Sequence, residues 1–120
     1  MTHRDSIAGL QARIQSFSED REWGQFHTPK NLILAATAEM GELAEVLQWK
    51  SDEEVAEFLR SGHGRERISE EIADVAIYLI RLCQTLNINF LEIIGKKVTE
   101  NDLKYPIDKS KGSAKKYKDL

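Results

Sequence analysis

Four carboxylates occur in two pairs with the same three-residue spacing, inside segments that are otherwise apolar. One pair is Glu39 and Glu42, and the other is Glu71 and Asp74. Burying an ionised carboxylate without a partner costs several kcal/mol, and clustering like charges adds to that cost. Each acid could pair with an Arg or Lys of a neighbouring helix or face solvent at an edge. Two matching pairs on apolar helices instead favour a bound cation that holds the acids together.

The kind of ligand selects the cation. No Cys or His lies within one helical turn of the four acids, so the donor set consists of oxygen alone. Such a set suits Mg²⁺, with Mn²⁺ as a possible substitute, and these ions are usually shared with substrate phosphates. The chain lacks both the calcium-loop pattern and the GxxxxGK[ST] phosphate loop. The sequence therefore predicts a phosphate substrate held through Mg²⁺ without a glycine-rich loop.

Composition limits the class of protein that carries these acids. With 120 residues, 41% hydrophobic and 31% charged, the chain is expected to form one folded domain. No apolar run approaches the roughly 20 residues of a membrane-spanning helix, so no membrane partner is expected. The acidic balance of residues 1–103 argues against nucleic-acid binding. The single cysteine, Cys83, suits a reducing compartment and is predicted to be buried. We expect a cytoplasmic protein.

Helices are expected to position the carboxylates. Apolar residues recur at helical spacing, and no stretch shows strand alternation, which predicts an all-α bundle of four to five helices. Thr28, Ser51 and Asn89 are predicted N-caps, and residues 61–64 are expected to break the chain. The predicted domain covers residues 1–104, and a lysine-rich tail of open role covers residues 105–120. The predicted helices span about residues 3–21, 29–50, 51–60, 65–86 and 89–104.

The predicted core follows two apolar stripes, with Phe17 and Phe58 as further core residues. Asp74 is flanked by apolar residues and is not expected to reach bulk water. The run Ile72–Ile80 leaves its helix almost no polar face, so one small bundle could not enclose all the apolar surface. This predicts a homo-oligomer. The stripes consist of Leu32, Ala36, Leu43 and Val46, and of Ile68, Ile72, Val75, Leu79, Leu82 and Leu86.

Several motifs together resemble one protein family. They are Phe26–Leu32, Glu39–Glu45, Gln48–Lys50, Glu70–Val75 and Lys104–Pro106. The chain resembles the MazG-like all-α nucleoside triphosphate pyrophosphohydrolases over about residues 14–117, and within them it is most similar to the dCTP pyrophosphatase group. The resemblance implies Mg²⁺-dependent hydrolysis of a dNTP, dCTP or a modified dCTP, to dNMP and pyrophosphate, a house-cleaning role in the nucleotide pool.

The resemblance also implies roles for individual residues. Glu39, Glu42, Glu71 and Asp74 match the metal ligands of the family, and either Glu39 or Glu42 could accept the proton of the attacking water. Relatives form dimers or tetramers that complete the site between subunits, so the same is expected here. A histidine of the animal members aligns near Ile14, which leaves the base preference open. The expected substrate-binding residues are Trp23, His27, Trp49, Tyr78, Lys97 and Asn101.

Two alternatives remain open at the level of sequence. Another all-α pyrophosphohydrolase, acting on dUTP or phosphoribosyl-ATP, would have similar carboxylates but lacks the Gln48–Lys50 context. A non-enzymatic helical assembly protein could use the acids to bind structural cations. A panel of substrates separates the first alternative, and a chelator separates the second, because an enzyme would lose turnover while its helices stay intact.

Overall fold

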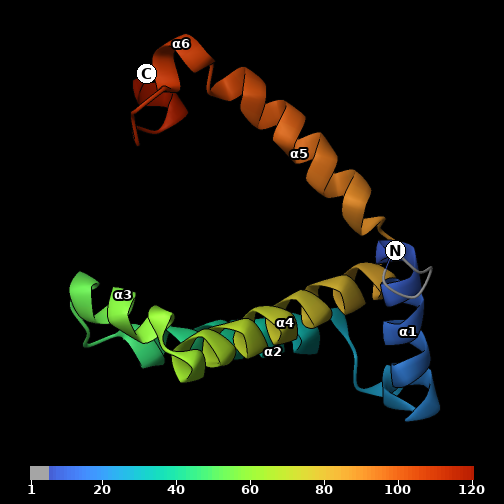
Figure 1. Ribbon diagram of the computed structural model, residues 1–120. Helices are drawn as coiled ribbons and strands as arrows, with labels where there is room; N and C mark the ends of the chain where they lie inside the picture. Colours follow the sequence, from blue (N-terminus) through green and yellow to red (C-terminus); the bar gives the residue numbers. More distant parts are fainter. Residues whose placement is uncertain (1–5) are drawn as a thin grey trace. The chain divides into compact units, whose positions relative to one another are not determined.

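Residues 6–120 are described by a computed structural model. Every regular element in that range is helical, which confirms the predicted all-α fold. In Figure 1 the elements follow the chain in the order α1 (Ile7–Asp20), η2 (Trp23–Gln25), α2 (Pro29–Leu47), α3 (Asp52–Arg60), α4 (Gly62–Thr85), α5 (Phe90–Lys104), α6 (Ile107–Ser110) and η3 (Tyr117–Asp119).

The chain divides into two compact units, one that ends at Asn87 and one that covers Ile88–Leu120. In the first unit α2 lies alongside α4 and forms its most extensive helix contact (Figure 1), and α1 and α3 also pack on α4. In the second unit the rings of Tyr105 and Tyr117 meet edge to face at 6.2 Å. The four carboxylates predicted to bind metal all lie on α2 and α4, in the first unit.

Side-chain caps begin the helices where the sequence predicts them. Thr28 accepts a hydrogen bond from the backbone N–H of Asn31, and Pro29 fills the first helical position, where a missing N–H costs nothing. Ser51 forms a full capping box with Glu54 at the start of α3. Asn89 accepts from the backbone N–H of Glu92 at the start of α5. All three predicted caps are confirmed.

Some predicted boundaries are wrong. The break predicted at residues 61–64 is confined to Ser61, which ends α3 and also caps α4, so Gly62 and Gly64 lie in the first turn of α4. A Cβ at Gly64 would collide with the carbonyl group of Phe58, which explains a glycine at this helical position. The predicted start at residue 3 lies outside the described residues, whereas Ser6 caps α1. Helix α2 ends at Leu47 rather than near residue 50, and the predicted tail contains α6 and η3.

The buried side of α4 is rotated by about one residue relative to the predicted stripe. Leu32 and Ala36 of α2 are buried as predicted, but Ile72 is 58% exposed, and Leu79 and Leu86 are also exposed. Glu71, at 5% exposure, is buried in the place where the stripe would put Ile72. The helical repeat then predicts that the buried positions of α4 recur every three and four residues from Glu71. These positions, all buried or half-buried, are Gly64, Ile68, Glu71, Val75, Tyr78 and Leu82.

Among the described residues no single helix is long and apolar enough to cross a membrane, although the bent pair Gly62–Leu86 and Phe90–Lys104 meets the criteria of length and composition together.

Candidate metal centre and adjoining cavity

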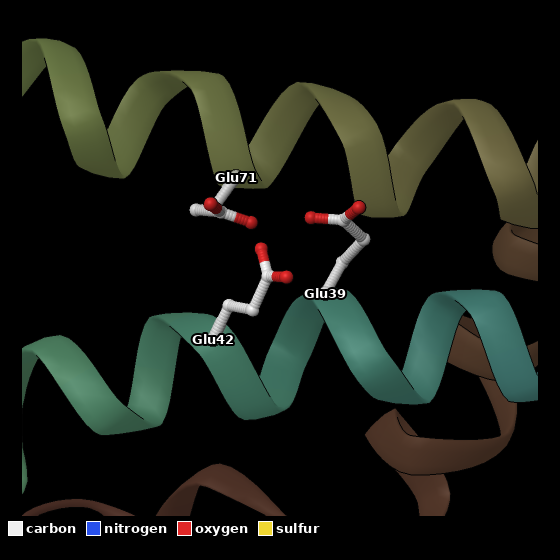
Figure 2. Close-up of side chains that lie close together, drawn as sticks. All are labelled: Glu39, Glu42 and Glu71. Atoms are coloured by element: carbon white, nitrogen blue, oxygen red, sulfur yellow. The ribbon is translucent and has the colours of Figure 1, made fainter.

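Three of the four predicted ligands come together between α2 and α4. Glu39 and Glu42 project from successive turns of α2 toward Glu71 of α4, as Figure 2 shows. One carboxylate oxygen from each residue lies within 4.8 Å of the other two. Glu39 is half-buried and Glu42 is exposed, so the cluster opens on one side. The i, i+3 spacing on one helix and the facing position on the other therefore produce a compact set of oxygen donors, as the sequence predicts.

The charges in this cluster are only partly compensated. Arg67 Nε lies 3.3 Å from Glu71 Oε1, one turn earlier on α4. The second oxygen of Glu71, Oε2, is buried and has no hydrogen-bond partner among the described residues. One guanidinium thus pairs with one of the three carboxylates, and a buried oxygen is left without a donor. A water, a shared proton or a cation would satisfy that oxygen.

The neighbouring acids favour a proton on Glu39 when no cation is bound. The pKa of Glu39 is raised from its ordinary 4.5 to about 7, mainly because its protonated carboxyl hydrogen bonds to Glu71, and further because of partial desolvation and the charges of Glu42, Glu71 and Asp74. A divalent cation would replace that proton and satisfy the unpartnered Oε2 of Glu71. An all-oxygen set that is open on one side fits Mg²⁺ or Mn²⁺, which keep several waters and share their coordination with phosphates.

Asp74 stands apart from the other three acids. It does not belong to the group within 4.8 Å, and it is exposed, so the prediction that it cannot reach water is wrong. The reason is its position on α4: three residues beyond Glu71 the helix has turned by about 60°, away from α2. Asp74 is nevertheless close enough to raise the pKa of Glu39. It also borders a separate cavity, so it lies where the acid cluster and that cavity approach each other.

The cavity has a volume of about 480 Å³ and lies between α1, the loop around η2, and α4. Three predicted substrate-binding residues line it: Trp23, His27 and Tyr78. The rings of Trp23 and His27 meet edge to face at 6.0 Å. Sequence reasoning missed several lining residues, most of which come from α1, a helix with no chemical motif, and two of which come from the last turns of α4. The missed residues are Leu10, Arg13, Phe17, Ser18, Ile77 and Arg81, and Ile14 also lines the cavity.

The prediction that Phe17 lies in the core is wrong, because the residue is 47% exposed. Its ring packs edge to face on Trp23 at 5.5 Å, and the guanidinium of Arg21 covers it at 3.7 Å. The two aromatic contacts connect Phe17, Trp23 and His27 into one wall of the cavity. Such a wall offers flat faces and edges of the kind that enclose a ring-shaped ligand.

The other predicted binding residues are not brought to this cavity. Trp49 follows α2 and is 87% exposed. Lys97 and Asn101 are exposed on α5, in the second unit, and Lys97 Nζ lies 3.4 Å from Glu100 Oε2. Their assignment to the substrate remains a prediction from the family resemblance. By contrast, Cys83 is buried as predicted, and burial raises the pKa of its thiol.

The raised pKa of Glu39 predicts how the metal-free protein responds to pH. A carboxyl group that binds its proton more tightly in the folded state than in the unfolded chain stabilises the fold below about pH 4.5, and that contribution is lost as pH rises through about 7. We expect the melting temperature of metal-free protein to fall over this window, and Mg²⁺ to reverse the fall. Thermal melts at a series of pH values measure this. A Glu39→Gln variant with the same slope as the wild type would contradict the assignment.

Comparison with known proteins gives one family match and relatives that align with most of the chain. The model of the MazG-like family matches residues 34–120, which include all four acids. Two relatives named dCTP pyrophosphatase 1, from Bos taurus and Homo sapiens, are 42% and 38% identical over 104 residues, or 87% of this chain. The chain spans only 62% and 61% of the length of these two proteins.

A solved structure shares the fold over nearly its whole length. The crystal structure of a pyrophosphatase from Archaeoglobus fulgidus superposes with a TM-score of 0.77 at 38% sequence identity. The match covers 88% of this chain and 97% of that one. The family model covers well over half of the chain, and the carboxylate pairs that led to the resemblance fall inside it. The chain belongs to the MazG-like family.

Proposed function

We propose that this chain is an Mg²⁺-dependent nucleoside triphosphate pyrophosphohydrolase that converts dCTP or a modified dCTP to dNMP and pyrophosphate. The observation that carries the proposal is the cluster of Glu39, Glu42 and Glu71, with its unpartnered buried oxygen, next to an aromatic cavity. Membership in the family and relatives named for dCTP support the substrate class.

The acids would hold the metal, and the cavity would hold the base. Glu39, Glu42 and Glu71, with Asp74 at their edge, are the proposed metal ligands. When bound, Mg²⁺ supplies positive charge that neutralises and polarises the triphosphate oxygens. Trp23, His27 and Tyr78 are the proposed contacts to the nucleoside. Asp74 borders the cavity and also contributes to raising the pKa of Glu39, so the cavity and the acid cluster adjoin each other. This arrangement suits a nucleotide, in which one sugar joins the base to the phosphates.

The reaction is a displacement at the α-phosphorus. A water oxygen bonds to that phosphorus, the bond from phosphorus to the α–β bridging oxygen breaks, and pyrophosphate leaves with the electron pair. A carboxylate of α2, Glu39 or Glu42, accepts the proton that the water loses. Both acids lie within the cluster, so either can reach a water held beside the phosphate. No serine or cysteine nucleophile is required.

Substrate contacts outside the cavity are proposed from the family resemblance. Trp49 would close on the base, and Lys97 and Asn101 of α5 would bind phosphate or sugar. We also propose a homodimer or homotetramer, because the exposed apolar side chains of α4, Ile72 and Leu79 among them, would be covered by a second copy. The one cysteine, buried and without a disulfide, suits the cytoplasm.

Product analysis tests the proposed function. With Mg²⁺ present, the chain is expected to release pyrophosphate, and not orthophosphate, from dCTP, and to release it more slowly from dUTP, dTTP and phosphoribosyl-ATP. Chromatography of the nucleotide products distinguishes dCMP from dCDP. A chelator should abolish turnover and leave helicity unchanged by circular dichroism. Formation of dCDP with orthophosphate would refute the proposed bond cleavage, and a preference for dUTP or phosphoribosyl-ATP would refute the proposed base.

A further inference from the structure

Arg81 is a buried cation at the wall of the cavity, and no carboxylate among residues 6–120 forms an ion pair with it. Its exposure is 8%, and neither ion pair found among residues 6–120 involves it. Its Nε donates to His27 Nδ1 at 2.9 Å, and its Nη1 donates to Gln84 Oε1 at 3.1 Å. Burying a charge without a counterion is costly, and hydrogen bonds to neutral groups offset only part of that cost. A buried arginine held in this way therefore suggests a role beyond packing.

Gln84, which accepts a hydrogen bond from Arg81, is itself held by the backbone of α1. Gln84 donates through Nε2 to the carbonyl oxygen of Gln11 at 2.8 Å. That bond orients the Gln84 amide so that its oxygen faces Arg81. The chain of hydrogen bonds from α1 through Gln84 and Arg81 to His27 thus fixes the guanidinium in a single orientation. His27 is its end point, and His27 lines the cavity.

The bond between Arg81 and His27 determines where the imidazole carries its proton. A guanidinium can only donate, so Nδ1 of His27 must be the acceptor and cannot be protonated. The remaining nitrogen, Nε2, then carries the proton of a neutral ring. Partial burial and the positive charge of Arg81 both lower the pKa of His27, which agrees with a neutral ring. His27 is therefore a hydrogen-bond donor through Nε2 and has no free acceptor.

We propose that Arg81 is a positioning residue that fixes His27 as a hydrogen-bond donor to an acceptor atom of the nucleobase. The proposal rests on the proposed function, because it takes the cavity to be the site of the base. A pyrimidine such as cytosine presents two ring-edge acceptors, O2 and N3, that such a donor can meet. Trp23 packs against the ring of His27 edge to face and limits its rotation. Arg81 also lines the cavity, and on this proposal its contribution to base binding comes through His27.

A double-mutant cycle separates this role from a structural one. Replacing His27 with Ala removes the ring through which Arg81 is proposed to act. We expect Arg81→Ala to raise KM for dCTP about tenfold with little change in kcat, as expected for loss of a binding contact. In the His27→Ala background the same change should cost less than about twofold. Equal costs in both backgrounds would overturn the proposal.

Matched controls identify the part of the substrate that is affected. Arg65, exposed on the same helix, provides the control Arg65→Ala, which should leave KM unchanged. Calorimetric binding of 2-deoxyribose 5-triphosphate, which lacks the base, should be the same for the wild type and Arg81→Ala. A loss of affinity for this base-free ligand as large as the loss for dCTP would show that Arg81 contacts phosphate or sugar, and would overturn the proposal.

Nitrogen NMR of the histidine rings tests the inference independently of turnover. In wild-type protein at neutral pH, His27 is expected to show a protonated Nε2 and an unprotonated Nδ1, and the Nδ1 signal should shift in Arg81→Ala. A proton on Nδ1 in the wild type would overturn the inference whether or not the protein hydrolyses dCTP. If the wild type fails to turn over dCTP, the proposed function is lost, while the NMR result still decides the tautomer.

Discussion

Replacing Glu42 with Gln is expected to lower kcat for dCTP about 100-fold or more while the protein stays folded. Removing a single preorganised charge that acts in a transition state typically costs two to three orders of magnitude. Glu42 belongs to the cluster in which one oxygen of each acid lies within 4.8 Å of the others. A neutral amide of the same shape cannot replace its charge toward a divalent cation. Steady-state pyrophosphate release measures the effect.

The stability of the same variant should change in the opposite direction. Without metal, Glu42 repels Glu39 and contributes to raising its pKa, so the neutral side chain relieves repulsion and should raise the melting temperature. The gain in melting temperature that Mg²⁺ gives the wild type should shrink. Glu45→Gln is the matched control, because Glu45 is exposed one turn further along α2 and lies outside the cluster. Wild-type turnover in Glu42→Gln, or an equal loss in Glu45→Gln, would refute the metal centre.

The acid cluster was accessible to sequence analysis because regular geometry positions it. Two acids at i and i+3 on a helix lie on neighbouring turns, and the apolar neighbours of Glu71 require that its helix packs closely against another. The location of Asp74 was not accessible in the same way. Whether a residue at the edge of a helix faces a neighbour or solvent depends on the rotation of α4 about its axis. The structure shows that this rotation buries Glu71 and exposes both Ile72 and Asp74.

The cavity could be predicted only in part, for a related physical reason. Trp23 and His27 were predicted from the family resemblance, and Tyr78 from its position one turn after Asp74. Arg81 gave no signal, since an arginine near the end of a helix is ordinarily solvated. Its burial results from tertiary contacts: Gln84, held by the backbone of α1, and His27, in the loop before α2, both bind it. Contacts between segments more than 50 residues apart in sequence leave no periodic pattern that could reveal them.

The apolar surface of α4 leads to the second large expected effect, on assembly. Ile72, Leu79 and Leu86 are exposed and recur every seven residues, so they form one stripe along the helix. A stripe of this kind on a folded unit is typical of a surface that packs on another helix. We expect wild-type protein to be at least a dimer at low micromolar concentration. Leu79→Glu should place a charge in that interface and weaken association by about 100-fold or more.

Light scattering of the wild type and Leu79→Glu over a dilution series measures this shift, and activity is followed in the same samples. Thr85→Glu is the control, because Thr85 is also exposed on α4 but lies about 120° around the helix from Leu79. The control should stay oligomeric and active. A wild type that is fully active as a monomer would refute both the assembly and a site shared between subunits. If Leu79→Glu unfolded without any change in molar mass, another part of the same chain would cover the stripe. Disrupting an interface between two copies would instead lower the molar mass, because the copies would dissociate.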